Sequence, residues 1–233
     1  MGLALRRALG VRDLELVVEP RPSGVSHLFN ARRREVYFRL VNDPGIHLRV
    51  LSRALAIPLQ SLRWHLAFLA RAGLVVTQTA GGNVGCFAAE SVEPEDRTLF
   101  VELRKGRRIA ILRHLLRRGP RRQNEIVKAL RTYQQAVLPD LRYLVESGLL
   151  KRIPESRGVS YRVSPGFLEK RGQYLNRARH VETLILAGLE QENLVPRTIR
   201  RGQGRSRISI SPGTSRVQIR LDFNAMERLL KKG

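Results

Sequence analysis

The side chains best suited to chemistry gather in one segment of the chain. They are Gln60, Ser61, Arg63, Trp64 and Arg71. At helical spacing most of them fall away from a stripe of leucines, so a helix would present them to solvent together. A glutamine amide can pair with adenine, and a guanidinium can pair with guanine or with a phosphate. The residue types therefore predict contacts to base edges and phosphates rather than bond-breaking chemistry.

The elements that position this segment are marked by apolar spacing. The sequence predicts a short helix with Leu48, Leu51 and Leu55 on one face, a break at Ile57-Pro58, and a second helix. Leu59, Leu62, Leu66, Leu69 and Gly73 line the inner face of that second helix. A β-ribbon with its tip at Ala80–Asn83 follows. Helix, turn, helix and ribbon are the layout of a winged helix-turn-helix, whose second helix enters the major groove of DNA. On that helix Trp64 and Phe68 are one turn apart and predict either packing against another helix or subunit, or contact with a thymine methyl or a sugar. His65 is expected to be half-buried and structural.

The chain repeats this pattern 75 positions later. The shift places Leu55 on Leu130, Gln60 on Gln135, Leu66 on Leu141, Leu69 on Leu144, Gly73-Leu74 on Gly148-Leu149 and Val84 on Val159. The shared positions are those that a helix-turn-helix must bury, so a repeat of one supersecondary unit is the economical interpretation. We expect a capping box at Thr132–Gln135, and Gln134, Gln135 and Arg142 as the groove-facing candidates of the second copy.

The second copy departs from the first in two ways. Pro139 lies inside its presumed recognition helix, where it costs about 3 kcal/mol or a kink, and Asp140 brings negative charge toward the presumed DNA face. Either the helix bends, or its regular part begins at Leu138-Pro139. The first ribbon, Val75–Ala88, carries no charge. The second ribbon is basic, and its cations are Lys151, Arg152, Arg157 and Arg162. We expect copy one to read bases and copy two to hold phosphates; the alternative is a second copy devoted to dimerisation or partner binding.

The net charge of +23, from 43 basic and 20 acidic side chains in 233 residues, favours a polyanionic partner. Nucleic acid is preferred over an anionic membrane, because no basic amphipathic helix stands free of a predicted core. The chain shows no membrane-length apolar run and no signal peptide, and the single Cys86 excludes an internal disulfide. A soluble, cytoplasmic, nucleoid-associated protein is expected.

Enzymatic sites find little support. The five histidines lack metal-ligand spacing, and no glycine-rich phosphate loop is present. Glu93, Glu95 and Asp96 are typical of a solvated helix start. We therefore expect no catalytic residue, no metal and no cofactor.

The expected fold class is α+β, mainly α, with two winged helix-turn-helix domains in tandem and a C-terminal extension. The expected ranges are an N-terminal extension at 1–30, the first domain at 31–92, the second at 93–163 and the C-terminal region at 164–233. The last region holds a long helix over Ser164–Glu190 with a stripe suited to dimerisation, and a hairpin of Arg207–Ile210 with Val217–Leu221. Between them, Arg197–Arg207 is expected to form an exposed basic arm or loop. Its Arg200, Arg201 and Arg205 would track phosphates or enter a minor groove, or the loop is merely solvated.

A run of matching residues also carries a family resemblance. His65-Leu66, Leu69 and Gly73-Leu74-Val75, after the Gly45-Ile46-His47 entry, resemble the winged helix-turn-helix of archaeal transcriptional regulators in the broad ArsR/MarR-like group. The resemblance covers Ala31–Ala88 well and Arg107–Val163 less well. It implies duplex DNA binding, commonly as a homodimer; the clusters of metal-sensing members are missing here. The competing hypotheses are a winged-helix scaffold that binds protein, and a general nucleoid or RNA-binding protein.

Overall fold

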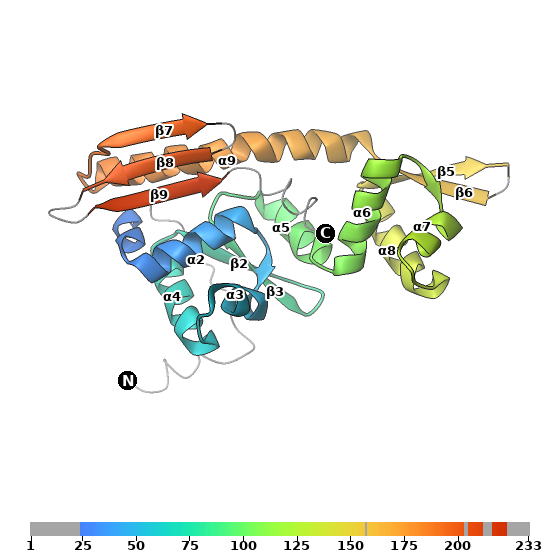
Figure 1. The fold of residues 1–233 in the computed structure, drawn as a ribbon, viewed down its shortest axis with the longest axis horizontal. Coiled ribbons are helices and arrows are strands. Elements are labelled where there is room, and N and C mark those ends of the chain that lie inside the picture. The colour runs from blue at the N-terminus through green and yellow to red at the C-terminus, as the bar shows by residue number, and fades with distance from the viewer. Residues whose placement is uncertain (1–23, 157, 203–204, 212–215, 223–233) are drawn as a thin grey trace. The chain divides into compact units, whose positions relative to one another are not determined.

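The computed structural model describes residues 24–156, 158–202, 205–211 and 216–222 (Figure 1). The short helix expected at Leu3–Leu9, the strand-like run Leu14–Val18, the helix Asn224–Lys232 and the wing residue Arg157 lie outside the described residues.

The chain divides into two compact units. Unit 1 combines Met1–Val101 with Asn176–Ala225, and unit 2 combines Glu102–Leu175 with Met226–Gly233. The expected boundaries at 92 and 163 follow the sequence repeat, whereas this division by contacts joins residues 176–225 to the first copy. The expected domain ranges stay a prediction.

The N-terminal part of unit 1 contains one 3-10 helix, four α-helices and three strands, which pack around one core. The elements are η1 (Val25–Phe29), α2 (Ala31–Asn42), β1 (Ile46–His47), α3 (Leu48–Leu55), α4 (Leu59–Arg71), β2 (Val75–Ala80), β3 (Asn83–Ala88) and α5 (Pro94–Leu103), which runs on into unit 2. The Asn30 side chain caps α2 by accepting the N–H groups of Arg32 and Arg33, both at 3.1 Å. The strands form an antiparallel sheet in the order β1-β3-β2, with Ile46 opposite Cys86.

Unit 2 contains the same order of elements. They are α6 (Gly106–Arg118), β4 (Arg121–Arg122), α7 (Gln123–Ala129), α8 (Gln134–Glu146), β5 (Leu150–Glu155) and β6 (Gly158–Val163), with sheet order β4-β6-β5. Helix α4 begins at 59 and α8 at 134, and the strand starts at 46, 75 and 83 recur at 121, 150 and 158. The repeat of 75 residues seen in the sequence is therefore also a repeat of secondary structure and of strand order.

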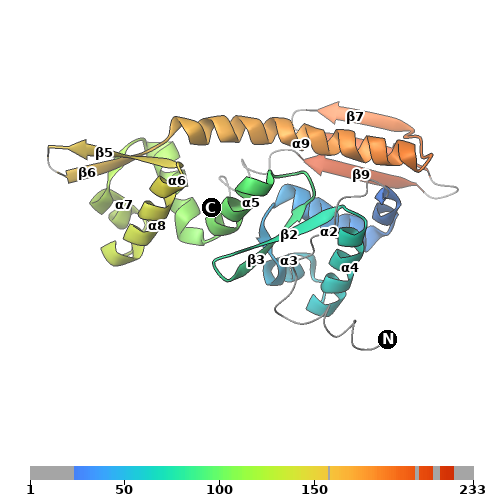
Figure 2. The same ribbon diagram turned by 180° about the vertical axis from the view of Figure 1, so that it is seen from behind.

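The C-terminal elements complete the core of unit 1. Helix α9 (Pro165–Gln191) leads from unit 2 into unit 1, where β7 (Thr198–Gly202), β8 (Arg205–Ile210) and β9 (Val217–Asp222) form an antiparallel sheet in that order. Figures 1 and 2 show the C-terminal half of α9 along one face of this sheet. Apolar side chains of α9 and the sheet join the core that holds α2, α3 and α4; they are Val181, Ile185, Leu189, Ile208, Ile210, Ile219 and Leu221.

This packing bears on two expectations for the C-terminal region. The apolar stripe of the long helix was expected to serve dimerisation; its Val181, Ile185 and Leu189 are buried inside unit 1, whereas its Leu168 and Leu184 are exposed, and dimerisation stays a prediction. The stretch Arg197–Arg207 was expected to be an arm or loop. Most of it instead lies in β7 and β8, which pair with one another. The hairpin expected from Arg207–Ile210 and Val217–Leu221 is confirmed as β8 and β9.

Among the described helices, none is both long and apolar enough to cross a membrane. Within the same residues, no three His, Cys, Asp or Glu side chains gather as a metal site would require.

Candidate nucleic-acid interface

Helix α4 is held against the core by its leucines and by the turn that precedes it. Leu62, Leu66 and Leu69 are almost completely buried. The turn from α3 passes through Ala56, which adopts a left-handed conformation with φ of 51°. The Ser52 hydroxyl donates a 2.6 Å hydrogen bond to the Ile57 carbonyl and closes the turn. The inner face of α4 is thus fixed, and its other faces are left for solvent and for neighbours.

The structure brings the predicted site residues of α4 to its surface to different extents. Gln60 and Ser61 are exposed in the first turn, and Trp64 is 52% exposed one turn later. Arg71 is exposed at the other end, where its Nε donates to the Ala67 carbonyl at 3.4 Å. Arg63 is half-buried, and its Nε has no hydrogen-bond partner among the described residues. Gln60 and Ser61 are therefore the most accessible polar groups at the end that a recognition helix inserts into the groove.

The aromatic pair of α4 packs within unit 1. The rings of Trp64 and Phe68 lie with centroids 4.4 Å apart. The Arg33 guanidinium from α2 stacks over both, 5.3 Å from the first centroid and 4.3 Å from the second, and Arg71 lies 4.6 Å from that of Phe68. Cations over aromatic faces contribute roughly 0.5–1 kcal/mol each at such half-exposed positions. The pair therefore contacts another helix through Arg33, while Trp64 stays 52% exposed, so contact of its ring with a thymine methyl or a sugar remains a prediction.

The sequence analysis did not predict the role of Arg33. Arg33 and Phe68 are far apart in the sequence, and only the fold brings them into contact. The neighbouring His65 is half-buried, as expected. Burial lowers the pKa of His65, and the positive charges of Arg33 and Arg32 lower it further. At neutral pH the imidazole is therefore uncharged, and the positive charge beside α4 comes from arginine.

Helix α8 exposes the corresponding residues of unit 2. Gln134, Gln135 and Arg142 are all exposed. The capping box expected at Thr132–Gln135 is wrong, because the N-cap residue is Tyr133 and its side chain forms no capping hydrogen bond. In unit 2 a side chain closes a helix start at α7 instead, where the Glu125 carboxylate accepts the Arg122 N–H at 2.7 Å.

Pro139 is accommodated inside α8, which runs as one helix from Gln134 to Glu146. A proline at this position removes the donor for the carbonyl four residues earlier. The Arg107 guanidinium from α6 donates to the neighbouring Ala136 carbonyl. This bond reaches the carbonyl next to that of Gln135, which loses its backbone donor, and it ties α8 to α6 within the same turn. The alternative of a regular helix that begins only at Leu138-Pro139 is wrong.

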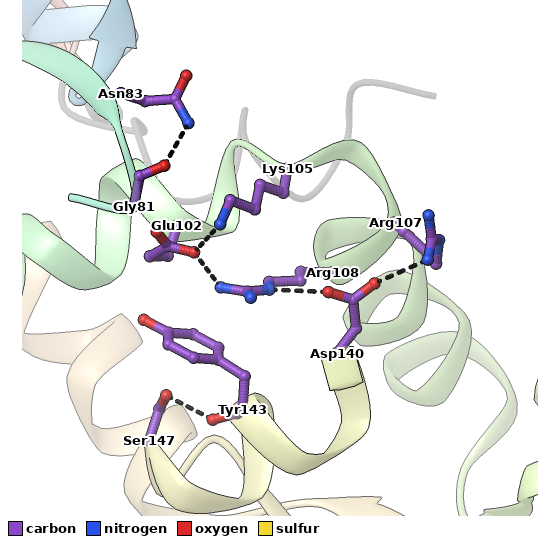
Figure 3. A network of polar contacts seen from close by, with 9 residues as sticks. All are labelled: Gly81, Asn83, Glu102, Lys105, Arg107, Arg108, Asp140, Tyr143 and Ser147. Atoms are coloured by element: carbon purple, nitrogen blue, oxygen red, sulfur yellow. Dashed lines mark hydrogen bonds and ion pairs between the residues drawn. The ribbon is translucent and has the colours of Figure 1, made fainter. Parts of the chain in front are cut away.

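Asp140 was expected to bring negative charge toward the DNA face of α8, and this expectation is also wrong. The residue is only 9% exposed and faces the unit interior (Figure 3). Its Oδ1 accepts from Arg108 Nε at 2.9 Å, and its Oδ2 lies 3.4 Å from Arg107 Nη1. Arg108 also pairs with Glu102 and lies with its Cζ 3.7 Å from the Tyr143 ring centroid. The carboxylate is thus a structural partner of buried arginine and leaves the outer face of α8 without its charge.

The hairpin of unit 2 carries exposed cations at adjacent positions. Lys151 and Arg162 lie directly opposite one another on β5 and β6, so their side chains share one face. Like charges at such a pair repel one another, which an anion between them would relieve. Arg152, opposite Tyr161, is exposed too.

The acidic Glu155 near the tip of the same hairpin is paired with Arg122 at 2.8 Å. Hydrogen bonds from Ser160 and Arg122 lower the pKa of Glu155.

The arginines of the C-terminal sheet differ in their partners. Arg201 Nε donates to the buried Glu182 of α9 at 2.7 Å, so this predicted contact residue is tied to the helix. Arg200 lies opposite Arg207, which lies opposite Arg220, and all three are exposed. Arg205 is exposed as well. Three guanidiniums in a row across three strands had no signal in the sequence, because strand pairing alone aligns them.

Two helices that meet at a tight turn, with the second exposed along one face and followed by a β-hairpin, form a helix-turn-helix unit compatible with the winged-helix fold. No model of a known protein family matches the chain. Over 142 residues, 61% of its length, the chain is 30% identical to an uncharacterized HTH-type transcriptional regulator of Methanocaldococcus jannaschii. The match covers 36% of that protein, so the chain spans little more than a third of its relative's length.

Proposed function

We propose that the protein is a sequence-specific regulator of transcription that binds double-stranded DNA through two winged helix-turn-helix domains in tandem. The observation that carries the proposal is the first turn of α4. Gln60 and Ser61 are exposed there, while the leucines of the same helix are locked into the core. A rigidly held helix with polar groups at its free N-terminal end is suited to base readout in the major groove. The similarity to a helix-turn-helix transcriptional regulator supports the same function.

In this proposal the two copies divide the work. Helix α4 reads bases with Gln60, Ser61 and Arg63, while α8 adds Gln134, Gln135 and Arg142. The cations of the second hairpin, Lys151, Arg152 and Arg162, hold phosphates. This division is supported by the uncharged first hairpin and by the like-charged pair on the second. Arg200 and Arg205 are further phosphate contacts, and the protein acts as a homodimer in the cytoplasm.

The test is selection of bound sites from a pool of randomised duplexes, with the full chain and its variants. Gln60→Ala and Arg63→Ala are each expected to cost about 1–3 kcal/mol on the selected site and to relax preference at one position. Gln191→Ala is the matched control, because it removes an exposed amide at the end of α9. If Gln60→Ala and Arg63→Ala both retain the wild-type preference, α4 is not the reading helix.

Salt dependence tests the proposed phosphate contacts separately. Lys151→Ala with Arg162→Ala should weaken binding about equally on all duplexes and reduce the slope of log affinity against log salt by about 2. A protein-binding scaffold would bind no duplex even at low salt. A nucleoid protein would bind all sequences alike, and the randomised pool would then return no consensus.

A further inference from the structure

Helix α2 and strand β9 border a hollow of about 560 Å³ in unit 1, and none of its lining residues is among the proposed DNA contacts. Its helical wall is a single face of α2, made by residues at helical spacing: Ala31, Arg34, Glu35 and Phe38. Its other wall is made by Arg216, directly before β9, and by Gln218 and Arg220 on one face of that strand. The intervening residues of β9 point into the core, where Ile219 and Leu221 are buried. The fold therefore fixes both walls.

The hollow has a strong positive charge. Three arginines line it against one carboxylate, that of Glu35, which already pairs with Arg32 at 3.1 Å. Arg216 and Arg220 form no ion pair with any residue that the structure describes. Like-charged guanidiniums repel one another across such a space, and a multiply charged anion would reverse that energy.

The guanidinium of Arg34 is held in place before any ligand arrives. Its Nη1 donates to the carbonyls of Leu28 and Phe29, both at 3.1 Å. Gln218 is oriented by Arg220, whose Nη2 donates to its side-chain oxygen at 3.4 Å. A site whose donors are pre-oriented binds with a smaller loss of side-chain entropy.

We propose that this hollow binds a small ligand with two or more phosphate groups and a planar ring, that is, a nucleoside di- or triphosphate. Arg34, Arg216 and Arg220 bind the phosphates, because the guanidinium fork matches phosphate oxygens in pairs. The half-buried Phe38 forms the one aromatic wall and packs against the ring. The volume falls within the range of small-molecule sites. The inference does not depend on duplex binding.

A free ligand fits better than the backbone of DNA bound at α4. In unit 1, α2 contacts α4 on one side and β9 on another, and both ribbon views place α2 between them (Figures 1 and 2). No residue of α4 lines the hollow, and Arg33, the residue of α2 that stacks on the rings of α4, does not line it either. Because Arg33 of α2 stacks on the aromatic pair of α4, a ligand at Arg34 contacts the same helix that supports α4.

The experiment is isothermal titration of the full chain with ATP, and separately with tripolyphosphate and with a 20-base-pair duplex. Arg216→Gln with Arg220→Gln should weaken ATP binding at least about tenfold, which is about 1.4 kcal/mol. The matched control is Arg117→Gln with Arg118→Gln, which removes the same charge from an exposed helix end in unit 2 and should change ATP affinity less than about twofold. Circular dichroism verifies that both double variants are folded.

Phe38→Leu tests the contact with the ring of ATP separately from the contacts with its phosphates. It should weaken ATP several-fold and leave tripolyphosphate binding unchanged. The proposal is overturned if wild-type protein does not bind ATP at millimolar concentration, or if the control double variant weakens ATP as much as the site variant. It is also overturned if Arg216→Gln with Arg220→Gln leaves ATP affinity intact and lowers only duplex affinity, because the hollow would then hold a phosphodiester backbone.

Discussion

The buried carboxylate of α8 offers the sharpest test of how unit 2 is held together. Asp140→Ala would leave Arg108 with Glu102 as its remaining partner and remove the pairing with Arg107. Both members of the pair are about nine-tenths buried, so solvent screens the interaction little. Breaking a buried ion pair costs roughly 3–5 kcal/mol. Because Glu102 stays in contact with Arg108, the lower end applies, and we expect a loss of about 3 kcal/mol.

The assay is urea unfolding followed by two signals. Far-UV circular dichroism reports helices of both units, whereas Trp64, the single tryptophan, lies in unit 1. For a unit of this size m is about 1–1.5 kcal/mol/M, so Asp140→Ala should lower the dichroism midpoint of unit 2 by about 2–3 M. The fluorescence midpoint of Trp64 should stay in place.

Glu146→Ala is the control, since it removes an exposed carboxylate from the end of the same helix and should change stability by less than about 0.5 kcal/mol. The combined substitution Arg108→Met with Asp140→Leu should cost less than Asp140→Ala alone, because no charge is left unpaired at that pair and Glu102 retains Lys105 at 2.6 Å. If Asp140→Ala shifts the midpoint no more than Glu146→Ala does, the network does not fix α8, and the reasoning is refuted.

Further predictions concern local packing and titration. Gly85→Ala should destabilise unit 1 by about 1–3 kcal/mol, because its new Cβ would lie 2.4 Å from Val101 Cγ2, whereas Gly106→Ala, with open space around it, should be neutral or stabilising; thermal melts of the two variants decide this. Burial raises the pKa of Cys86 to about 12, so maleimide at pH 8 should label it only at the rate at which unit 1 opens, and rapid labelling of native protein would contradict that burial. The lowered pKa of His65 means that its contribution to stability is complete above about pH 6.5 and is lost as the pH falls. His65→Gln should therefore flatten the decline in unfolding free energy on acidification, and an unchanged decline would show that the histidine is solvated like a free one.

The helices of both copies were predictable because their signals are local. The spacing of Leu62, Leu66 and Leu69 identifies the buried face of α4 without knowledge of what covers it. The exposure of Gln60 follows from that face by elimination. The wrong predictions concerned residues whose partners lie far away in the sequence. Asp140 looked surface-bound because the buried Arg108, 32 residues earlier, is invisible in its local pattern.

The C-terminal region shows the same limit. Strand β7 is exposed along its whole length, so it lacks the alternation that marks a half-buried strand, and its arginines suggested a loop. The stripe of α9 was identified correctly as apolar, but the surface that it covers is a sheet built from residues that follow it. Periodicity identifies the apolar face of a helix. Only the tertiary structure determines whether that face packs against the same chain or against another copy.

The core of unit 1 draws on residues from Val25 to Leu221, with the whole of residues 102–175 between its two parts. During synthesis from the N-terminus, α2 to α5 leave the ribosome long before α9 and β7–β9 exist to cover them. The helices and strands of the second helix-turn-helix, α6 to β6, come from one uninterrupted stretch, 106–163, and are synthesised before those strands. A nascent chain stopped after Val163 would consequently hold the complete second helix-turn-helix unit, while the core of the first would still lack α9 and β7–β9.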